Sequence, residues 1–239
     1  MPARRGLALP LVLGVLSIAL LLALGTWQVE RRAWKLGLIA RVEHHLTAPP
    51  VAAPGPGAWP RIGADDAYTR VRLHGRFLHD RETLVQALTE RGAGFWVVTP
   101  LRTPAGFTVL VNRGFVPAER RAPAARLAAQ LAGPVTVTGL LRLTEPKGAM
   151  LRANDPQGGR WYSRDVAAIA RVRGLAGVAP YFVDADGAAN PDGYPVGGLT
   201  VISFPNNHLV YAITWYGLAL LVGWALVRLV QMRRADMAE

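Results

Sequence analysis

Residues 205–227 read PNNHLVYAITWYGLALLVGWALV, and the organisation of the chain follows from this stretch. The nineteen residues from Leu209 to Val227 carry no charge, which at about 1.5 Å per residue is close to the thickness of the hydrocarbon layer of a bilayer. The stretch therefore predicts a membrane-spanning helix over residues 206–228. Its start combines an Asn pair suited to capping a helix with His208 in the first turn.

One face of this helix carries the side chains most suited to holding a ligand. At about 100° per residue, Tyr211, Trp215 and Ala219 all lie within roughly 60° of His208. A belt of aromatic residues with a histidine at the level of the lipid headgroups explains the same pattern. From position alone, both interpretations stay open.

A second apolar run follows Arg4 and Arg5 near the N-terminus. It predicts a membrane span over 6–26, because it is longer than the apolar core of a signal peptide and lacks a small-residue cleavage site. The helical pattern continues, so we expect a juxtamembrane amphipathic helix over 27–46. Its Arg31 and Arg32 either contact lipid phosphates or bind a carboxylate of a partner or ligand.

The charges around the second span predict the orientation, because those around the first span, with Arg31, Arg32, Lys35 and Arg41 after it, point the other way. Arg228, Arg233 and Arg234 follow the second span, whereas Lys and Arg are absent between Gly174 and His208. The positive-inside rule then places both termini and the tail 229–239 in the cytoplasm, and the central region in the periplasm. No mitochondrial leader precedes the first span, which favours a bacterial inner (cell) membrane with a multi-pass protein.

Composition excludes several classes of function. The chain has 27 basic and 16 acidic residues, hence a net charge of +11. The basic residues are scattered without a nucleic-acid reader motif, which argues against nucleic acid and leaves membrane lipids or an acidic partner. There is no cysteine, which excludes disulfides, thiolate metal sites, covalent haem attachment through CxxCH and a cysteine nucleophile. The HExxH, GxSxG and Walker motifs are missing as well.

Between the spans, the apolar pattern changes to a period of two. Residues 47–63 are rich in Pro and Gly and predict a linker. Strands are expected at Tyr68–Phe77, Thr83–Leu88, Gly94–Leu101, Phe107–Val111, Val135–Leu143, Tyr181–Asp184 and Leu199–Phe204. Helices are expected at Ala122–Leu131 and Asp165–Arg173, with Ser163 as a candidate cap of the second. The prediction is a mostly β domain over 64–204 with a mainly antiparallel sheet, and a membrane α+β fold class overall.

Histidines of this domain are the candidate acid–base groups for an enzyme. His79 beside Asp80, and His74, would serve that role, but solvated or locally hydrogen-bonded histidines explain them equally well. No nucleophile or metal-ligand set accompanies them in the sequence. Adjacent His44 and His45 are about 100° apart on a helix, a poor arrangement for chelating one metal. We therefore predict that the chain is not an enzyme.

Several groups of residues carry a family resemblance. They are Gly25-Thr26-Trp27-Gln28-Val29 with Arg31-Arg32 and Trp34-Lys35, then Val111-Asn112-Arg113-Gly114-Phe115-Val116-Pro117, then Asn207-His208-Leu209 with Tyr211 and Thr214-Trp215-Tyr216-Gly217. Weaker markers are Gly139–Glu145, Tyr162-Ser163-Arg164-Asp165 and Gly197-Gly198. Together, from about Leu24 to Ala219, they resemble the surfeit locus family of cytochrome c oxidase assembly factors.

This resemblance implies two spans around a domain on the outer side of the coupling membrane, and a chaperone role in respiratory chain biogenesis. It also implies that haem a is bound by a histidine at the start of the second span, which is His208 here. We expect haem a to be taken from haem a synthase and presented to cytochrome c oxidase subunit I. The alternative is a haem-free scaffold that stabilises a subunit I assembly intermediate.

The chemistry of the neighbouring residues is compatible with that ligand. Neutral imidazole is a good ligand of iron, and Tyr211, Trp215 and Ala219 offer an apolar wall for a macrocycle. The propionates of the haem need cations near the membrane surface. The candidates are Arg31 and Arg32, or Arg113 and Arg164 from the domain.

Overall fold

The computed structural model describes residues 5–149, 152–187, 190–191, 193–200 and 204–235. The chain divides into two compact units. One consists of Met1–Arg41 with Ser203–Glu239, and the other consists of Val42–Ile202. The first unit contains the two long helices, and the second is rich in β-structure. The expected α+β class is confirmed.

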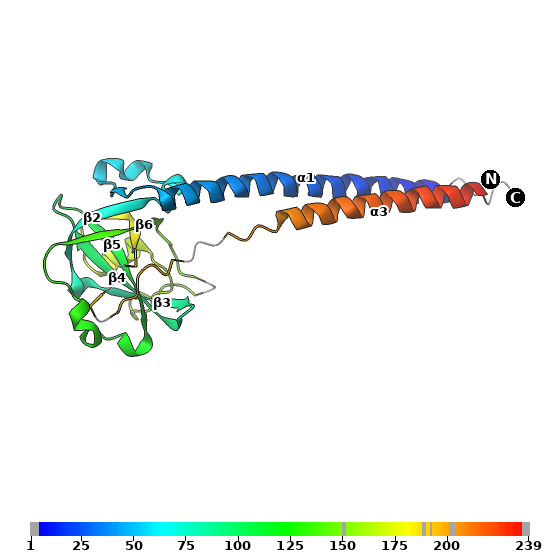
Figure 1. Ribbon diagram of the computed structural model, residues 1–239. Helices are drawn as coiled ribbons and strands as arrows, with labels where there is room; N and C mark the ends of the chain where they lie inside the picture. The colour runs from blue at the N-terminus through cyan, green and yellow to red at the C-terminus, as the bar shows by residue number, and fades with distance from the viewer. Residues whose placement is uncertain (1–4, 150–151, 188–189, 192, 201–203, 236–239) are drawn as a thin grey trace. The chain divides into compact units, whose positions relative to one another are not determined.

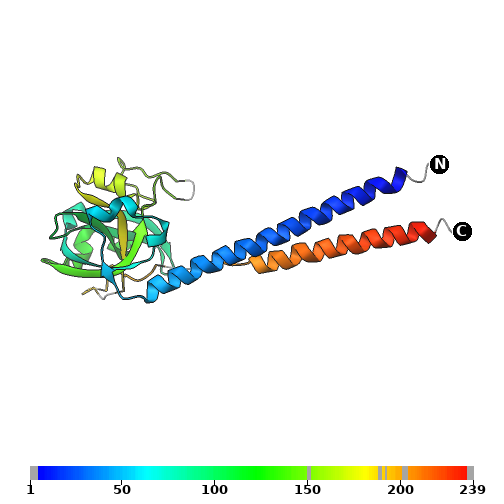
Figure 2. The ribbon, with the colours of Figure 1, turned by 90° about the horizontal axis from the view of Figure 1, so that it is seen from above.

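The helices α1 (Arg5–Thr47) and α3 (His208–Ala235) run antiparallel and side by side in the first unit (Figures 1 and 2). The segments expected at 6–26 and 27–46 form one uninterrupted helix. Both helices are long and apolar enough to cross a membrane, with mean hydropathies of 2.5 and 1.8 over their most apolar windows. The expected pair of candidate spans is thus confirmed by length and composition.

Small residues line the contact between α1 and α3. A Cβ at Gly14 would lie 2.5 Å from Leu226, and a Cβ at Gly25 would lie 2.6 Å from the ring of Tyr216. On α3, Ala212 and Ala219 are buried on the side that contacts α1. The less exposed positions of both helices recur every three or four residues, as in an antiparallel coiled coil. Close approach of the two backbones therefore depends on these small side chains.

The second unit is built on a β-barrel. Its described strands are β1 (Val51–Ala52), β2 (Arg70–Phe77), β3 (Thr83–Thr89), β4 (Gly92–Arg102), β5 (Thr108–Pro117), β6 (Val135–Leu143) and β7 (Val178–Ala185). They follow the order β1-β2-β6-β7-β5-β4-β3, and an additional pairing of β2 with β4 closes a ring of five strands. Among the described strands, β1–β2 and β5–β7 pair in parallel and the rest antiparallel. This is the five-stranded Greek-key barrel of OB folds.

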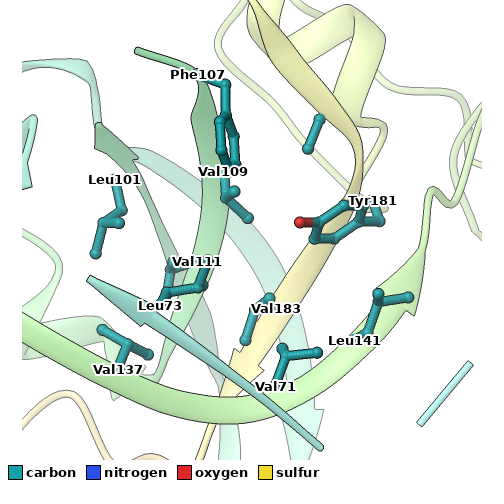
Figure 3. Close-up of a cluster of buried hydrophobic side chains, with 11 residues drawn as sticks. Val71, Leu73, Leu101, Phe107, Val109, Val111, Val137, Leu141, Tyr181 and Val183 are labelled. Carbon is teal, nitrogen blue, oxygen red and sulfur yellow. The ribbon is translucent and has the colours of Figure 1, made fainter. Parts of the chain in front are cut away.

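The inside of the barrel is a tightly packed apolar core (Figure 3). All five strands of the ring contribute, because alternate residues of each strand point inward. The members include Val71, Leu101, Val111, Leu141 and Tyr181. The hydroxyl of Tyr181 donates a 2.8 Å hydrogen bond to the carbonyl oxygen of Pro54, and burial raises the pKa of this tyrosine.

A second apolar layer covers the outside of β5 and β7. The short helix α2 (Val166–Val172) places Ile169 against Leu110 and Phe182, and Trp161 joins the same cluster. As a consequence, β5 is buried on both faces from Thr108 to Val116. Polar side chains on this outer face must therefore find partners within the protein.

Most of the expected strands are confirmed, and β6 has the predicted bounds. The expected strand Leu199–Phe204 falls partly on residues 201–203, outside the described residues, and Leu199, Thr200 and Phe204 are not in a strand. Within the expected linker 47–63, residues 51–52 form β1 and the 3₁₀ helix η1 spans Pro56–Arg61. The other 3₁₀ helices are η2 (Ala64–Asp66), η3 (His79–Arg81) and η4 (Ala118–Arg120).

Two predictions about helices are wrong. In place of an α-helix over Ala122–Leu131, the chain forms the 3₁₀ helix η5 (Pro123–Ala129), broken at Arg126. Arg126 leaves the helical conformation, and its guanidinium pairs with buried Glu82. The cap of α2 is Asp165, which accepts a 3.0 Å hydrogen bond from the backbone N–H of Ala168. Ser163 instead donates to the carbonyl oxygen of Glu145.

Candidate functional site

The first residue of α3, His208, is held by a side chain of α1. Its Nδ1 atom lies 2.7 Å from Oε1 of Gln28. Because an amide oxygen can only accept, Nδ1 is the donor of this hydrogen bond, and Nε2 is the nitrogen left for another partner. Gln28 is only 9 % exposed, and no described residue hydrogen-bonds to Nε2 of His208. Imidazoles that bind a metal commonly have their other nitrogen anchored by a hydrogen bond of this kind.

The two aromatic residues predicted beside His208 lie differently. Trp215 is on the side of α3 that faces α1, and its Nε1 atom is buried without a hydrogen-bond partner among the described residues. Tyr211 is 53 % exposed and does not share that contact. Ala219 is buried between the helices, so it cannot serve as an open wall for a ligand.

The predicted cap of α3 is not formed by Asn206. Its Oδ1 atom is buried and has no hydrogen-bond partner among the described residues. The carbonyl oxygen of Asn207 accepts the N–H of Tyr211, which is the ordinary first bond of the helix. Two buried polar atoms therefore lack partners in the described chain, the amide oxygen of Asn206 just before α3 and the indole nitrogen of Trp215 in its second turn.

Cations of α1 follow Gln28 along the helix. The guanidinium of Arg31 stacks on the ring of Trp34, with 4.0 Å from Cζ to the ring centroid. Arg32 lies one turn beyond Gln28 and is partly buried. Lys35 lies 5.4 Å from the ring centroid of Phe204. Within the described ranges, neither Arg31 nor Arg32 pairs with a carboxylate, so both can bind an anionic group of a ligand.

In the β unit, the motif residues converge on Asp184 at the outer face of β7. Its carboxylate accepts hydrogen bonds from Asn112 at 2.8 Å, Arg142 at 2.7 Å, Arg164 at 2.9 Å and Thr200 at 3.1 Å. The side chain is almost completely buried. Three stretches of sequence that resemble the family are thus joined by one carboxylate that motif reasoning did not single out. The available signal was its position two residues after Phe182, on the same face of a strand that is buried on both sides.

A second carboxylate completes this network. Glu145 binds Arg164 through hydrogen bonds of 3.0 and 2.5 Å. Burial acts to raise the pKa of Glu145, but the hydrogen bonds and charge of Arg164 outweigh it and lower this pKa. Burial acts to lower the pKa of Arg164, but the negative charges of Asp184 and Glu145 outweigh it and raise this pKa. Two arginines face two carboxylates, so the network fixes the loop after β6 to the barrel and leaves Arg164 engaged.

The network borders a cleft of about 340 Å³. Trp96, Leu88 and Leu199 add apolar surface to its wall, beside Arg142 and Arg164. Because the arginines are already paired with Asp184 and Glu145, the cleft carries little free positive charge.

Arg113 is also engaged within the β unit. Its Nη2 donates to the carbonyl oxygen of Ala129 and, at 3.4 Å, to Oδ1 of Asn190. Its guanidinium stacks on Phe77, with 4.9 Å to the ring centroid. Burial lowers the pKa of Arg113 to about 10. Nη1 is buried without a partner in the described structure.

The candidate acid–base histidines do not form a catalytic pair. Nε2 of His79 lies 3.2 Å from the carbonyl oxygen of Leu131, while Asp80 pairs with Arg81. Burial lowers the pKa of His79. His74 hydrogen-bonds to Thr136. Within the described ranges, no group of three His, Cys, Asp or Glu side chains is placed to hold a metal ion.

Comparison with known proteins agrees with this set of residues. The pattern of the SURF1 family matches residues 15–220. Surfeit locus protein 1 of Homo sapiens is 39 % identical over 215 residues, covering 82 % of this chain and 69 % of the human protein. The SURF1-like protein of Monosiga brevicollis is 38 % identical over 220 residues, covering 86 % and 82 % of the two chains. The family is known for cytochrome c oxidase assembly factors and is not known for enzymes. With the match spanning both helices and the barrel, the chain belongs to the SURF1 family.

Proposed function

We propose that this protein is an assembly factor that binds haem a at His208 and presents it for insertion into subunit I of a haem-copper cytochrome c oxidase. The observation that carries the proposal is the hydrogen bond between His208 and Gln28. It engages Nδ1 and leaves Nε2 without a described partner, and a free ring nitrogen of this kind is what an imidazole uses to ligate iron. Haem a is cargo in this proposal, not a resident cofactor.

Other residues of the helix unit fit the same cargo. Arg31 and Arg32 pair with no described carboxylate, so they can take the propionates, and guanidinium groups bind carboxylates bidentately. The exposed ring of Tyr211 and the indole of Trp215 supply apolar contact. The buried N–H of Trp215 lacks a partner and can donate to a polar substituent of the macrocycle. Arg113 and Arg164 are left out, because both are engaged in the β unit.

A carrier must release what it binds. A single histidine on the protein side favours reversible binding, since the second axial position of iron stays available to water or to an acceptor. Haem a synthase is then the donor and oxidase subunit I the acceptor. The apolar helices lie among the lipids of a bacterial inner membrane in this proposal, and the arginines that follow the second span support an orientation with the barrel in the periplasm.

Purification from cells that make haem a tests the proposal. Wild type is expected to carry the cofactor in a pyridine haemochrome spectrum, and His208→Ala is expected to lose it. His44→Ala, which changes an exposed histidine near the C-terminal end of α1, is the control and should keep it. Cells without haem a synthesis give the blank. Equal haem in wild type and His208→Ala would remove His208 from the site.

A haem-free scaffold for a subunit I intermediate is the alternative. It is favoured by the burial of Ala212 and Ala219 against α1, which uses part of the expected haem face for helix packing. A scaffold co-purifies with oxidase subunits and shows no Soret band. The absorbance of the purified complex therefore separates the two functions.

A further inference from the structure

Two arginines stand directly opposite each other where the barrel closes. Arg76 of β2 and Arg102 of β4 are partners in the antiparallel register, so their side chains leave the same face of the sheet with Cβ atoms about 4.5–5.5 Å apart. Both are exposed. Like charges in this position destabilise a sheet.

No described carboxylate neutralises this pair. The ion pairs of the described chain involve other arginines. Barrel closure itself requires the glycine at Gly75, because a Cβ there would collide with the carbonyl oxygen of Arg102. Barrel closure does not require Arg76 and Arg102 to be charged. The repulsion between these two arginines therefore destabilises the sheet without helping to form the barrel.

The pair borders a groove of about 480 Å³ on the outside of the barrel. Leu78, Pro104, Pro134 and Val135 supply apolar surface, and His74 adds a polar side chain. The size falls within the range of sites for small organic ligands. Among its described lining residues there is no Asp or Glu.

We propose that this groove binds an organic phosphate, with the phosphate between Arg76 and Arg102 and an aliphatic part along the prolines and Leu78. A phosphate monoester carries about −1.5 to −2 charges at pH 7, which matches two fixed positive charges better than a single carboxylate does. Guanidinium forks bind phosphate oxygens bidentately. The phosphate belongs either to a soluble ester or to the headgroup of an anionic lipid. The site is independent of His208 and of haem.

Calorimetric titration of the full chain with hexyl phosphate tests the site. The protein is held in nanodiscs of phosphatidylcholine. Wild type is expected to bind, and Arg76→Gln or Arg102→Gln is expected to weaken binding by about tenfold or more, since each removes charge-assisted hydrogen bonds. Arg91→Gln removes one exposed positive charge in the β3–β4 turn and should bind like wild type. Hexanoate, a monoanion of similar length, should bind more weakly than hexyl phosphate.

Thermal stability at low salt is a second measurement, in which the variants should equal or exceed wild type although they bind hexyl phosphate more weakly. Removing one arginine relieves the repulsion, so Arg76→Gln and Arg102→Gln should melt no lower than wild type. Phosphatidic acid in the nanodiscs distinguishes the sources, because competition with hexyl phosphate assigns a lipid headgroup and lack of competition assigns a soluble ester. No binding by wild type, or equal affinity in wild type and in the double variant Arg76→Gln/Arg102→Gln, would overturn the proposal.

Discussion

Nδ1 of His208 donates a 2.7 Å hydrogen bond to Oε1 of Gln28 across the α1–α3 contact. The two residues are 180 positions apart in the chain, and they meet because small residues let the helices approach. The buried side chain of Gln28 fixes which ring nitrogen of His208 donates and the direction in which the imidazole points. Gln28 is therefore a positioning residue for the proposed ligand of iron.

Substitution of Gln28 tests this role. Gln28→Leu is expected to weaken haem binding about 10–100-fold, the usual effect of losing a partner of a metal-binding histidine. Gln28→Glu should keep binding and lower the midpoint potential of the iron, because a carboxylate makes the imidazole more basic. Titration of the protein with haem, followed by absorbance, measures the affinity, and redox titration of the haem bands measures the potential. Gln231→Leu, an exposed position of α3, is the control. Unchanged affinity and potential in both variants would contradict the role.

Packing of the helix pair predicts a sharp contrast between two glycines. A side chain at Gly25 collides with the ring of Tyr216, whereas Gly37 has nothing within 4 Å. Gly25→Val should push α1 and α3 apart, and Gly37→Val should not. The chain has no cysteine, so spin labels at Leu20→Cys and Leu220→Cys report the separation without background. A distance distribution unaffected by Gly25→Val would show that the contact is not close.

The buried pair of Arg126 and Glu82 predicts a large loss of stability. The side chains are 0 % and 7 % exposed. Arg126→Met leaves a buried carboxylate unpaired, which costs about 3–5 kcal/mol. Adding Glu82→Gln should recover much of that loss, since the uncompensated charge is removed. Urea unfolding followed by tryptophan fluorescence gives the double-mutant cycle. Additive losses in the double variant would argue against coupling.

The lowered pKa of Glu145 predicts how stability responds to acid. Its partner Arg164 holds the folded pKa below the ordinary value of 4.5. The contribution of Glu145 to stability is therefore fully present above about pH 4.5 and is lost as the pH falls through the lower folded pKa. The difference in melting temperature between wild type and Glu145→Gln should shrink from pH 6 towards pH 3. A difference that grows on acidification would reverse the assigned shift.

Trp215→Phe separates packing from ligand binding. The indole N–H has no partner in the described chain, so the variant loses no described hydrogen bond, and the smaller ring should lower the unfolding free energy of the haem-free protein by only about 1 kcal/mol. If the N–H donates to the cargo, the variant should show a shifted Soret maximum and weaker binding. Identical spectra would exclude that hydrogen bond.

Alternation of apolar residues was enough to predict most of the barrel, because strands with one face inward have a clear period of two. The extent of β5 was underestimated at Val111, since Asn112 and Arg113 interrupt the apolar pattern. Their partners, Asp184 and the carbonyl oxygen of Ala129, come from distant parts of the chain. The failure of the helix prediction at Arg126 has the same origin, because its pairing with Glu82 overrides local propensity.

For the candidate site, sequence placed His208 at a helix start but did not find its partner. Helical spacing shows which residues share a face of one helix, but it does not show which face a second helix covers. Trp215 and Tyr211 therefore looked equivalent, although one lies in the contact and the other is exposed. The role of Asp184 was missed for a similar reason, since a single acidic residue at the end of a strand has no pattern of its own.

Closure of the five-stranded ring has a consequence for solubility. A strand with unpaired backbone groups is a template for pairing with another chain, and a closed ring removes such edges. Here β1 is two residues long, and β3 is attached outside the ring. The outer edge of β3 is partly paired as well, because the N–H of Gln86 donates to the carbonyl oxygen of Trp161, so the barrels of two copies offer each other little unpaired backbone.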